Sequence, residues 1–245
     1  MTKDDLAPAK FYLLQLAAKS IPTAEGRTME MVLGCYLIVT GNGRHLLIDS
    51  GMAPDARPPE APPPAQEKTV LELLSELGLK PEDIDTVICS HFDVDHAGFH
   101  DAFPHAEFLV QRTHYEAARG GHPRAAKARP HWDHPSLRYR LVEGDTELLP
   151  GLTLIETSGH VAGHQSVLVC LPNTGPVLLT IDAVMMARLF TPDRPAWPLD
   201  EDLEQLRAST IKLLDIARDS KSSLVIFGHD GLQWQSLRKA PEFYD

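Results

Sequence analysis

Short apolar segments recur along the chain and predict a protein built largely from β-strands. Each segment has four to seven residues, is alternating or continuously apolar, and is bounded by turn-forming residues, as is typical of half-buried and buried strands. The segments expected to be strands are residues 10–16, 35–40, 44–49, 84–89, 107–111, 138–142, 152–156, 167–171, 177–181 and 224–227. Residues 17–31 are broken by Pro22 and Gly26, and we expect a loop there.

Other segments carry the spacing or the end signals of helices. In residues 67–77 apolar side chains recur at helical spacing, and Gly78 follows as a C-terminal cap. A short helix is expected over residues 113–119. Asp200 is expected to cap a longer helix that has an apolar face. The chain is therefore expected to combine strands with helices.

Residues 54–66 are rich in proline, which supplies six of the thirteen positions. Because proline lacks a backbone N–H group, this stretch is not an internal strand or helix. An ordered flap of polyproline type and a disordered linker both fit its composition. Strands of the same apolar character resume after it, so we interpret it as a flap and not a boundary, within one domain over residues 1–245.

Composition and charge argue against several classes of protein. The 245 residues are 43% hydrophobic, as in ordinary globular domains, and contain no apolar run as long as a membrane span. The N-terminus lacks the pattern of a signal peptide and the three cysteines are widely spaced, so we expect a cytoplasmic protein with reduced thiols. A net charge of −11, without a cluster of Lys or Arg, argues against nucleic acid as a partner.

The most informative stretch is residues 91–98, which read His-Phe-Asp-Val-Asp-His-Ala-Gly and follow an expected buried strand. Side chains two positions apart on an extended segment point to the same side, so His91, Asp93 and Asp95 can converge. His96 turns back toward them as the chain bends. Burying two carboxylates so close together is costly without a cation, and one or two divalent metal ions would remove that cost. The alternative is a solvated acidic loop.

Three other segments deliver a residue of ligand type at or just after the end of an apolar strand. These residues are His160, Asp182 and His229. Four segments with this arrangement indicate a single site at strand ends, which is where α/β folds build their sites. Asp49 also ends an apolar strand, and we expect it either to orient a neighbouring ligand or to cap a turn.

The remaining histidines are not expected to bind metal. His131 and His134 lie in a short motif of similar composition, but residues 120–135 contain three prolines and follow no evident buried strand. We therefore expect this stretch to be a surface loop. His100, His105 and His114 are likewise not expected to bind metal.

The motifs resemble those of the metallo-β-lactamase superfamily and, within it, the N-acyl homoserine lactonase family. The signature His-x-His-x-Asp-His is similar to residues 91–96, and Thr-Pro-Gly-His-x-Pro-Gly-His-Gln-Ser is similar to residues 157–166. Residues 178–183 and 227–230 look like the motifs that carry a bridging aspartate and the last histidine. The resemblance extends from about Cys35 to the end of the chain.

The resemblance implies an α/β fold, an αββα sandwich with two metal ions at one edge. The implied ligands of one ion are His91, Asp93 and His160, and those of the other are Asp95, His96 and His229. Asp182 would bridge the two ions, and Asp49 would lie behind the site. His164 matches a histidine that the family does not use as a ligand.

Two positions depart from the family pattern. Asp93 replaces the second histidine of the signature, and three aspartates with a bridging hydroxide would cancel all four charges of two divalent ions. We therefore expect weaker acidification of bound water, with Zn²⁺ joined by Mn²⁺ or Fe²⁺ as suitable ions. Met185 replaces a tyrosine whose hydroxyl helps to hold the substrate carbonyl. Because methionine donates no hydrogen bond, either another donor in the substrate pocket or a different substrate is expected.

The resemblance implies a hydrolase that opens a lactone ring, most directly that of an N-acyl homoserine lactone or a related lactone. A metal-bridging hydroxide would attack the ester carbonyl, and Asp95 would pass a proton to the leaving alkoxide. The proline-rich flap and residues 185–199 are expected to shape the pocket. We expect a small-molecule partner and no membrane; a homodimer is also compatible with the sequence.

Two alternatives stay open. Another hydrolase of this fold would act on a thioester or a small phosphodiester, and an Arg or Lys in the pocket would favour the phosphodiester. A metal-binding protein without catalysis is the second alternative. The full set of ligand-type residues argues against it, whereas Asp93 and Met185 keep it open.

Overall fold

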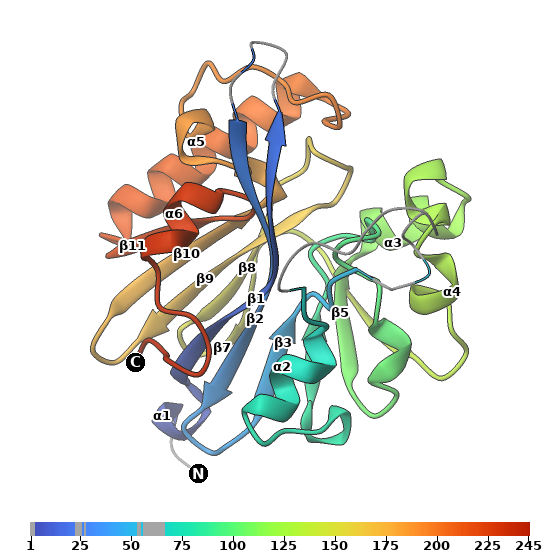
Figure 1. The fold of residues 1–245 in the computed structure, drawn as a ribbon, viewed down its shortest axis with the longest axis vertical. Coiled ribbons are helices and arrows are strands. Elements are labelled where there is room, and N and C mark those ends of the chain that lie inside the picture. Colours follow the sequence, from blue (N-terminus) through green and yellow to red (C-terminus); the bar gives the residue numbers. More distant parts are fainter. Residues whose placement is uncertain (1–2, 23–25, 27, 53–54, 56–66) are drawn as a thin grey trace.

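A computed structural model describes residues 3–22, 26, 28–52, 55 and 67–245, in which the strands form two sheets (Figure 1). The first sheet has the order β1-β2-β3-β4-β5-β6 and the second β11-β10-β9-β8-β7. The strands of the first sheet are β1 (Pro8–Pro22), β2 (Thr28–Thr40), β3 (His45–Ile48), β4 (Thr86–Ile88), β5 (Glu107–Gln111) and β6 (Arg138–Val142). Those of the second are β7 (Thr146–Leu149), β8 (Leu152–Glu156), β9 (Gln165–Leu171), β10 (Gly175–Ile181) and β11 (Leu224–Phe227).

The two sheets pack face to face around a shared apolar core. Strands β3 to β6 are parallel, as are β10 and β11, and the other neighbours in each sheet are antiparallel. The core between the sheets includes Leu13, Tyr36, Ile48 and Leu109 from the first sheet and Leu154, Val169, Leu179 and Ile226 from the second. Burying alternate side chains of both sheets in this way removes their apolar faces from water.

Helices cover both outer faces of the sandwich. The α-helices are α1 (Lys3–Leu6), α2 (Val70–Glu76), α3 (Arg112–Arg119), α4 (Arg129–Trp132), α5 (Leu203–Asp219) and α6 (Gly231–Ser236). In Figure 1, α3 and α4 lie on one side of the sheets and α5 on the other. A second apolar cluster joins α2, α3 and α4 to the first sheet, and a third joins α5 to the second. The four layers confirm the expected αββα sandwich. None of the helices in the described ranges is long and apolar enough to cross a membrane.

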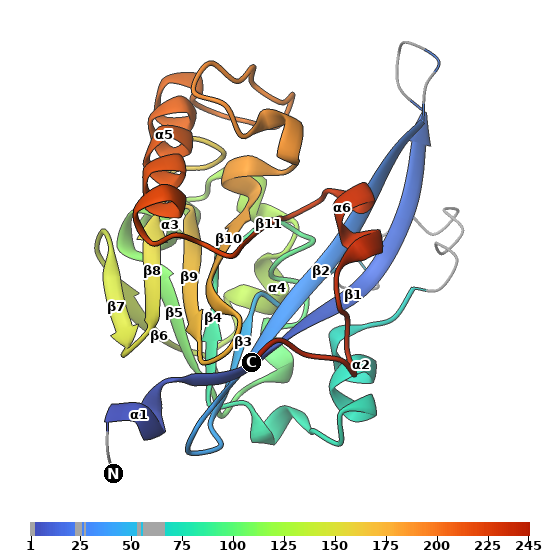
Figure 2. The same ribbon diagram turned by 90° about the vertical axis from the view of Figure 1, so that its left-hand side faces the viewer.

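The expectation of a loop over residues 17–31 is wrong for residues 17–22 and 28–31, which are strand, whereas residues 23–25 and 27 lie outside the described residues. β1 and β2 pair along their whole length, as far as Pro22 opposite Thr28, and their ends project beyond the sheets (Figure 2). Residues 18–22 are exposed, so no apolar pattern marks this part of the strand. Pro22 stands at the last position of β1, where a missing N–H group interrupts no further pairing.

The expected surface loop over residues 120–135 is also wrong in part. It contains a 3₁₀ turn at Pro123–Ala126 and the short helix α4, and in each of them a proline stands at the start. The side chain of Trp132, 1% exposed, stacks on Phe92 with ring centroids 4.6 Å apart. This segment is therefore anchored on the signature loop. The expected flap at residues 54–66 lies outside the described residues, apart from Asp55.

The packing of α6 on β2 yields a first prediction. A Cβ atom at Gly34 would lie 2.9 Å from Cζ3 of Trp234, and the indole is fixed because its Nε1 donates to the carbonyl of Phe227. Gly34→Ala is therefore expected to lower the free energy of unfolding by about 1–3 kcal/mol, measured by urea denaturation. The Trp234→Phe background, which lacks the clashing ring atoms, should reduce that cost. An unchanged stability of Gly34→Ala would show that the indole can move aside.

Candidate metal centre

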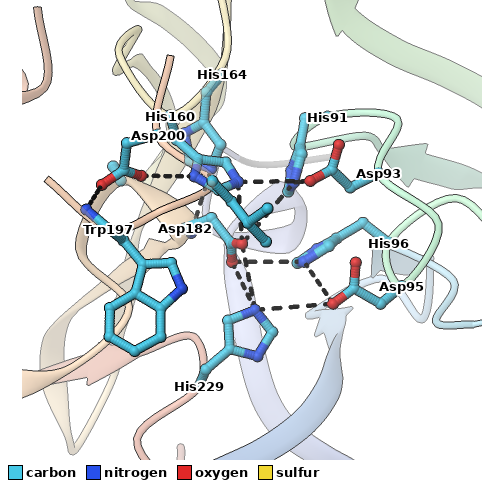
Figure 3. Close-up of polar contacts among 12 residues, drawn as sticks. His91, Asp93, Asp95, His96, His160, His164, Asp182, Trp197, Asp200 and His229 are labelled. Carbon is cyan, nitrogen blue, oxygen red and sulfur yellow. Dashed lines mark hydrogen bonds and ion pairs between the residues drawn. The ribbon is translucent and has the colours of Figure 1, made fainter. Parts of the chain in front are cut away.

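Strand ends bring the seven predicted ligand residues together at one edge of the sandwich (Figure 3). Residues 91–96 follow β4, and His160 follows β8. Asp182 comes directly after β10 and His229 shortly after β11. The ends of β8, β10 and β11 in the second sheet and of β4 in the first thus lie at the same place, as the sequence pattern indicated.

A first cluster consists of His91, Asp93 and His160. Nε2 of His91 lies 3.4 Å from Oδ2 of Asp93, and Nε2 of His160 lies 3.5 Å from the same oxygen. A tetrahedral metal with bonds of about 2.1 Å separates its ligand atoms by about 3.4 Å. The first cluster therefore has the size of a metal site.

A second cluster consists of Asp95, His96 and His229. Oδ2 of Asp95 lies 3.9 Å from Nε2 of His96 and 4.0 Å from Nε2 of His229. Asp182 connects the clusters, because its Oδ2 lies 3.3 Å from Nε2 of His160 and its Oδ1 lies 3.0 Å from Nε2 of His229. This carboxylate has the position of a group shared by two ions.

Several buried atoms in the clusters make no hydrogen bond. They are Nε2 of His91, Nε2 of His96 and Oδ1 of Asp182. Buried polar atoms are almost always bonded, and leaving one unbonded costs about 1–3 kcal/mol. All three point at their own cluster, where a divalent cation would accept their lone pairs. The donor set of imidazoles and carboxylates suits Zn²⁺, Mn²⁺ and Fe²⁺.

In each histidine of the clusters, Nδ1 lies on the side away from the cluster and is held by a hydrogen bond, so that Nε2 faces the site. Nδ1 of His96 lies 2.8 Å from Oδ2 of Asp49, as expected for an aspartate behind the site. The hydroxyl of Ser90 also donates to Asp49, at 2.6 Å, and lies 2.9 Å from Nδ1 of His91. Asp49 thereby fixes one histidine of each cluster. Nδ1 of His229 lies 2.8 Å from the carbonyl of Val32 on β2.

Asp200 holds His160 in the same way, although its position in the sequence indicated a helix cap. The cap of α5 is Asp202, whose side chain accepts from the backbone N–H of Gln205. Oδ1 of Asp200 lies instead 2.8 Å from Nδ1 of His160. The buried guanidinium of Arg194 bonds to its other oxygen at 3.2 Å. The only sequence signal was an aspartate two positions before the actual cap.

Arg124 is a second residue that the sequence analysis did not find. It lies in the 3₁₀ turn of the segment that was expected to be a surface loop. Its Nε lies 2.6 and 2.7 Å from the two oxygens of Asp93, and its Nη2 bonds to Asp93 and lies 2.6 Å from Nε2 of His160. Nothing in the surrounding sequence separates this arginine from Arg119 or Arg129, since only the fold brings it to the site.

Met185 and His164 lie behind the ligand shell. The side chain of Met185 is 3% exposed and belongs to the apolar cluster under α5, so it contributes no open wall to a pocket. Nε2 of His164 accepts from the backbone N–H of Asp182 at 3.3 Å, while its Nδ1 lies 2.8 Å from the hydroxyl of Thr157. His164 therefore positions the shared carboxylate.

The histidines that were not expected to be ligands lie outside the clusters. His105 is exposed, and His131 bonds to Asp101 and Asp55. His100 is buried against the hydroxyl of Ser50.

The charges of the clusters set the proton affinity of each group. Burial raises the pKa of Asp182, but His229 and His96 outweigh it and hold that pKa well below its ordinary value. Burial lowers the pKa of His96, but Asp182 and Asp95 outweigh it and raise that pKa well above the ordinary value. The pKa of Asp93 is lowered because His91, His160 and Arg124 outweigh its burial. Protons and a metal ion compete for the same lone pairs here.

The model of the metallo-β-lactamase superfamily matches residues 35–229. Among curated proteins, an N-acyl homoserine lactonase of Bacillus sp is 33% identical over 248 residues, which cover 96% of each chain. The N-acyl homoserine lactonase AttM of Rhizobium radiobacter is 33% identical over 239 residues, which cover 85% of this chain and 86% of AttM. Similarity to these enzymes thus extends over most of the sequence.

Solved structures of N-acyl homoserine lactone lactonases are also similar to this chain. A quorum-quenching N-acyl homoserine lactone lactonase matches with a TM-score of 0.85 and 31% identity, over 98% of this chain and 100% of that chain. An N-acyl homoserine lactone hydrolase, with the product N-hexanoyl-L-homoserine bound at its catalytic metal centre, matches with a TM-score of 0.83 and 29% identity over the same shares.

His114 connects the two loops that carry the first cluster, and it yields a second prediction. Its Nε2 accepts from the backbone N–H of Phe92 at 2.8 Å, and its Nδ1 lies 2.9 Å from the carbonyl of Ala162, so the imidazole is neutral. Burial, with a smaller contribution from His91, lowers its pKa to about 4. The unfolded chain takes up this proton near pH 6.5, so the stabilisation present above pH 6.5 is lost as the pH falls toward 4, by up to about 3 kcal/mol.

His114→Gln keeps an acceptor and a donor but does not titrate. In metal-free protein, the free energy of unfolding of the wild type should fall more steeply between pH 6.5 and 4 than that of His114→Gln. Urea denaturation at a series of pH values measures this difference. Exposed His105→Gln is the control and should retain the wild-type slope. Parallel curves for wild type and His114→Gln would refute the assignment of a neutral, buried imidazole.

Proposed function

Because the chain belongs to the N-acyl homoserine lactonase family of the metallo-β-lactamase superfamily, we propose that it is a metal-dependent hydrolase that opens the ring of an N-acyl homoserine lactone or a related lactone. The observation that carries this proposal is the pair of donor clusters joined by Asp182. A relative of nearly the same length binds the ring-opened product at its metal centre.

In this proposal each cluster holds one divalent ion and Asp182 is shared by both. His91, Asp93 and His160 hold the first ion, and Asp95, His96 and His229 hold the second. Bound ions of this kind acidify water to a nucleophile and act as Lewis acids toward an ester carbonyl. We propose Zn²⁺ as the resident ion, and the three carboxylates also suit Mn²⁺ or Fe²⁺.

The protein's own groups fix the geometry of the reaction. Asp49 and Asp200 hold the imidazoles, so the site is assembled before the substrate arrives. Asp95 has the most exposed of the three carboxylates, with 23% of its side chain accessible, against 14% for Asp93 and 5% for Asp182. Asp95 can therefore carry a proton to the leaving alkoxide, which stays attached to the product after the ring opens.

One observation favours a second candidate, the hydrolysis of a small phosphodiester. Arg124 supplies the cationic side chain that would favour this reaction, and it lies directly at the first cluster. Its Nε and Nη2 are engaged by Asp93 and His160, however, and Nη1 donates to the carbonyl of Leu199. In this arrangement the guanidinium has no face free for a phosphate. Since the relatives over most of the chain are lactonases, we favour the lactone.

The stoichiometry of the reaction tests the proposal. Opening a lactone gives a carboxylic acid, which is fully ionised at neutral pH, so each turnover releases one proton and yields a single product that is heavier by one water. We expect acidification of a weakly buffered solution by metal-loaded protein with N-acyl homoserine lactones. Mass spectrometry should show one product. Aromatic and simple γ-lactones, a thioester and a phosphodiester complete the panel.

His160→Ala removes a first-cluster histidine and should lower kcat/KM by at least about a hundredfold, since even the outer partners of metal ligands are worth about ten- to a hundredfold. Exposed His105→Ala is the matched control and should retain the wild-type rate. If every lactone stays closed while a thioester or a phosphodiester is split in a metal-dependent reaction, the proposed function is wrong and the family assignment stands.

A further inference from the structure

The guanidinium of Arg124 takes the place of a cation at the first cluster. Its Nε and Nη2 together occupy both oxygens of Asp93. Nη2 also lies 2.6 Å from Nε2 of His160. Since arginine has only donors, the lone pair of that nitrogen points at the guanidinium. Two of the three ligand atoms of the cluster are therefore committed to Arg124.

A metal ion in the first cluster needs the same lone pairs. An ion bound by Asp93 and His160 would lie about 2.0–2.2 Å from each ligand atom, which is the space that Nη2 occupies. A guanidinium and a divalent ion also repel each other strongly at such a distance. With Arg124 in this arrangement, the guanidinium and the ion exclude each other.

The second cluster has no such competitor. In the described part of the chain, no Lys or Arg side chain bonds to Asp95, His96 or His229. Nε2 of His96 makes no hydrogen bond, so an ion can bind there without displacing a side chain. The two clusters thus differ in what must move before an ion binds.

From this difference we propose that Arg124 exchanges with a divalent ion at the first cluster. The second cluster consequently fills first and with higher affinity, and the first fills only when Arg124 turns away from Asp93. This inference rests on the proposed function only in taking both clusters as metal sites.

A carboxylate outside the first cluster lies close to Arg124. Arg124, His122 and Glu201 line one recess beside Asp93, so a carboxylate is available to a guanidinium that leaves the cluster. While Arg124 is in place, it neutralises Asp93, and the pair carries the same net charge as the neutral histidine of the family signature. A carboxylate at position 93 is thereby stable in the absence of the first ion.

Metal affinity, read without turnover, tests the exchange. Zn²⁺ is titrated into metal-free protein in competition with a chromophoric chelator of known affinity, and elemental analysis gives the final stoichiometry. We expect two equivalents with distinct affinities in the wild type. In Arg124→Gln the weaker affinity should tighten by about tenfold or more, because the charge-assisted bonds to Asp93 are lost, while the tighter should change by less than about twofold.

Arg129→Gln is the matched control, since Arg129 lies on α4 in the same segment but is exposed and paired with Asp133. Its titration should match the wild type. If Arg124→Gln does not fold, Arg124→Lys serves instead: lysine keeps the charge but not the fork that engages both oxygens, so the weaker affinity should again tighten.

Three outcomes of the affinity measurements would overturn the exchange. They are equal affinities of the two equivalents in the wild type, unchanged affinities in Arg124→Gln, and a weaker affinity that loosens when Arg124 is replaced. Two equivalents with the expected shift, in a protein that opens no lactone, would refute the proposed function alone. A protein that binds fewer than two ions both as wild type and as Arg124→Gln would refute the exchange.

Discussion

The site depends on one electrostatic constraint, which is that carboxylates largely withdrawn from water need positive charge beside them. Asp93, Asp95 and Asp182 approach one another within a few ångströms of the same imidazoles. Without a cation, burial of this group would be unfavourable by several kcal/mol. Two features of the structure provide positive charge, or a place for it, beside these carboxylates. Unbonded lone pairs are directed at places that suit a divalent ion, and Arg124 brings a permanent charge to the cluster that contains Asp93.

The αββα sandwich serves this constraint by fixing the ligands from outside the site. Asp49 at the end of β3 holds histidines of both clusters, directly and through Ser90. The carbonyl of Val32 in the long hairpin holds His229, so the outer part of this hairpin, which the sequence did not predict, contributes to the site. Asp200, ahead of α5, holds His160. The first sheet and the segment before α5 therefore both support the candidate metal centre.

The convergence of the seven candidate ligand residues could be predicted from the sequence because each follows an apolar strand, and buried strand ends are visible in the pattern. The supports of that set could not be predicted. Arg124 lies in a polar segment whose buried anchor, Trp132, cannot be recognised without knowing that it packs on Phe92. Asp200 was mistaken for a helix cap because caps and histidine partners are both short acidic residues. The sequence pattern likewise gave no sign of the guanidinium that offsets the charge of Asp93.

Anomalous diffraction at the zinc edge tests the central claim, that the two clusters are paired cation sites, most directly. Crystals grown with one equivalent of Zn²⁺ should show a peak among Asp95, His96 and His229, with Arg124 still on Asp93. Crystals grown in excess Zn²⁺ should show a second peak in the first cluster, with Arg124 turned away. A single peak that stays single in excess zinc, or zinc bound outside both clusters, would contradict the account.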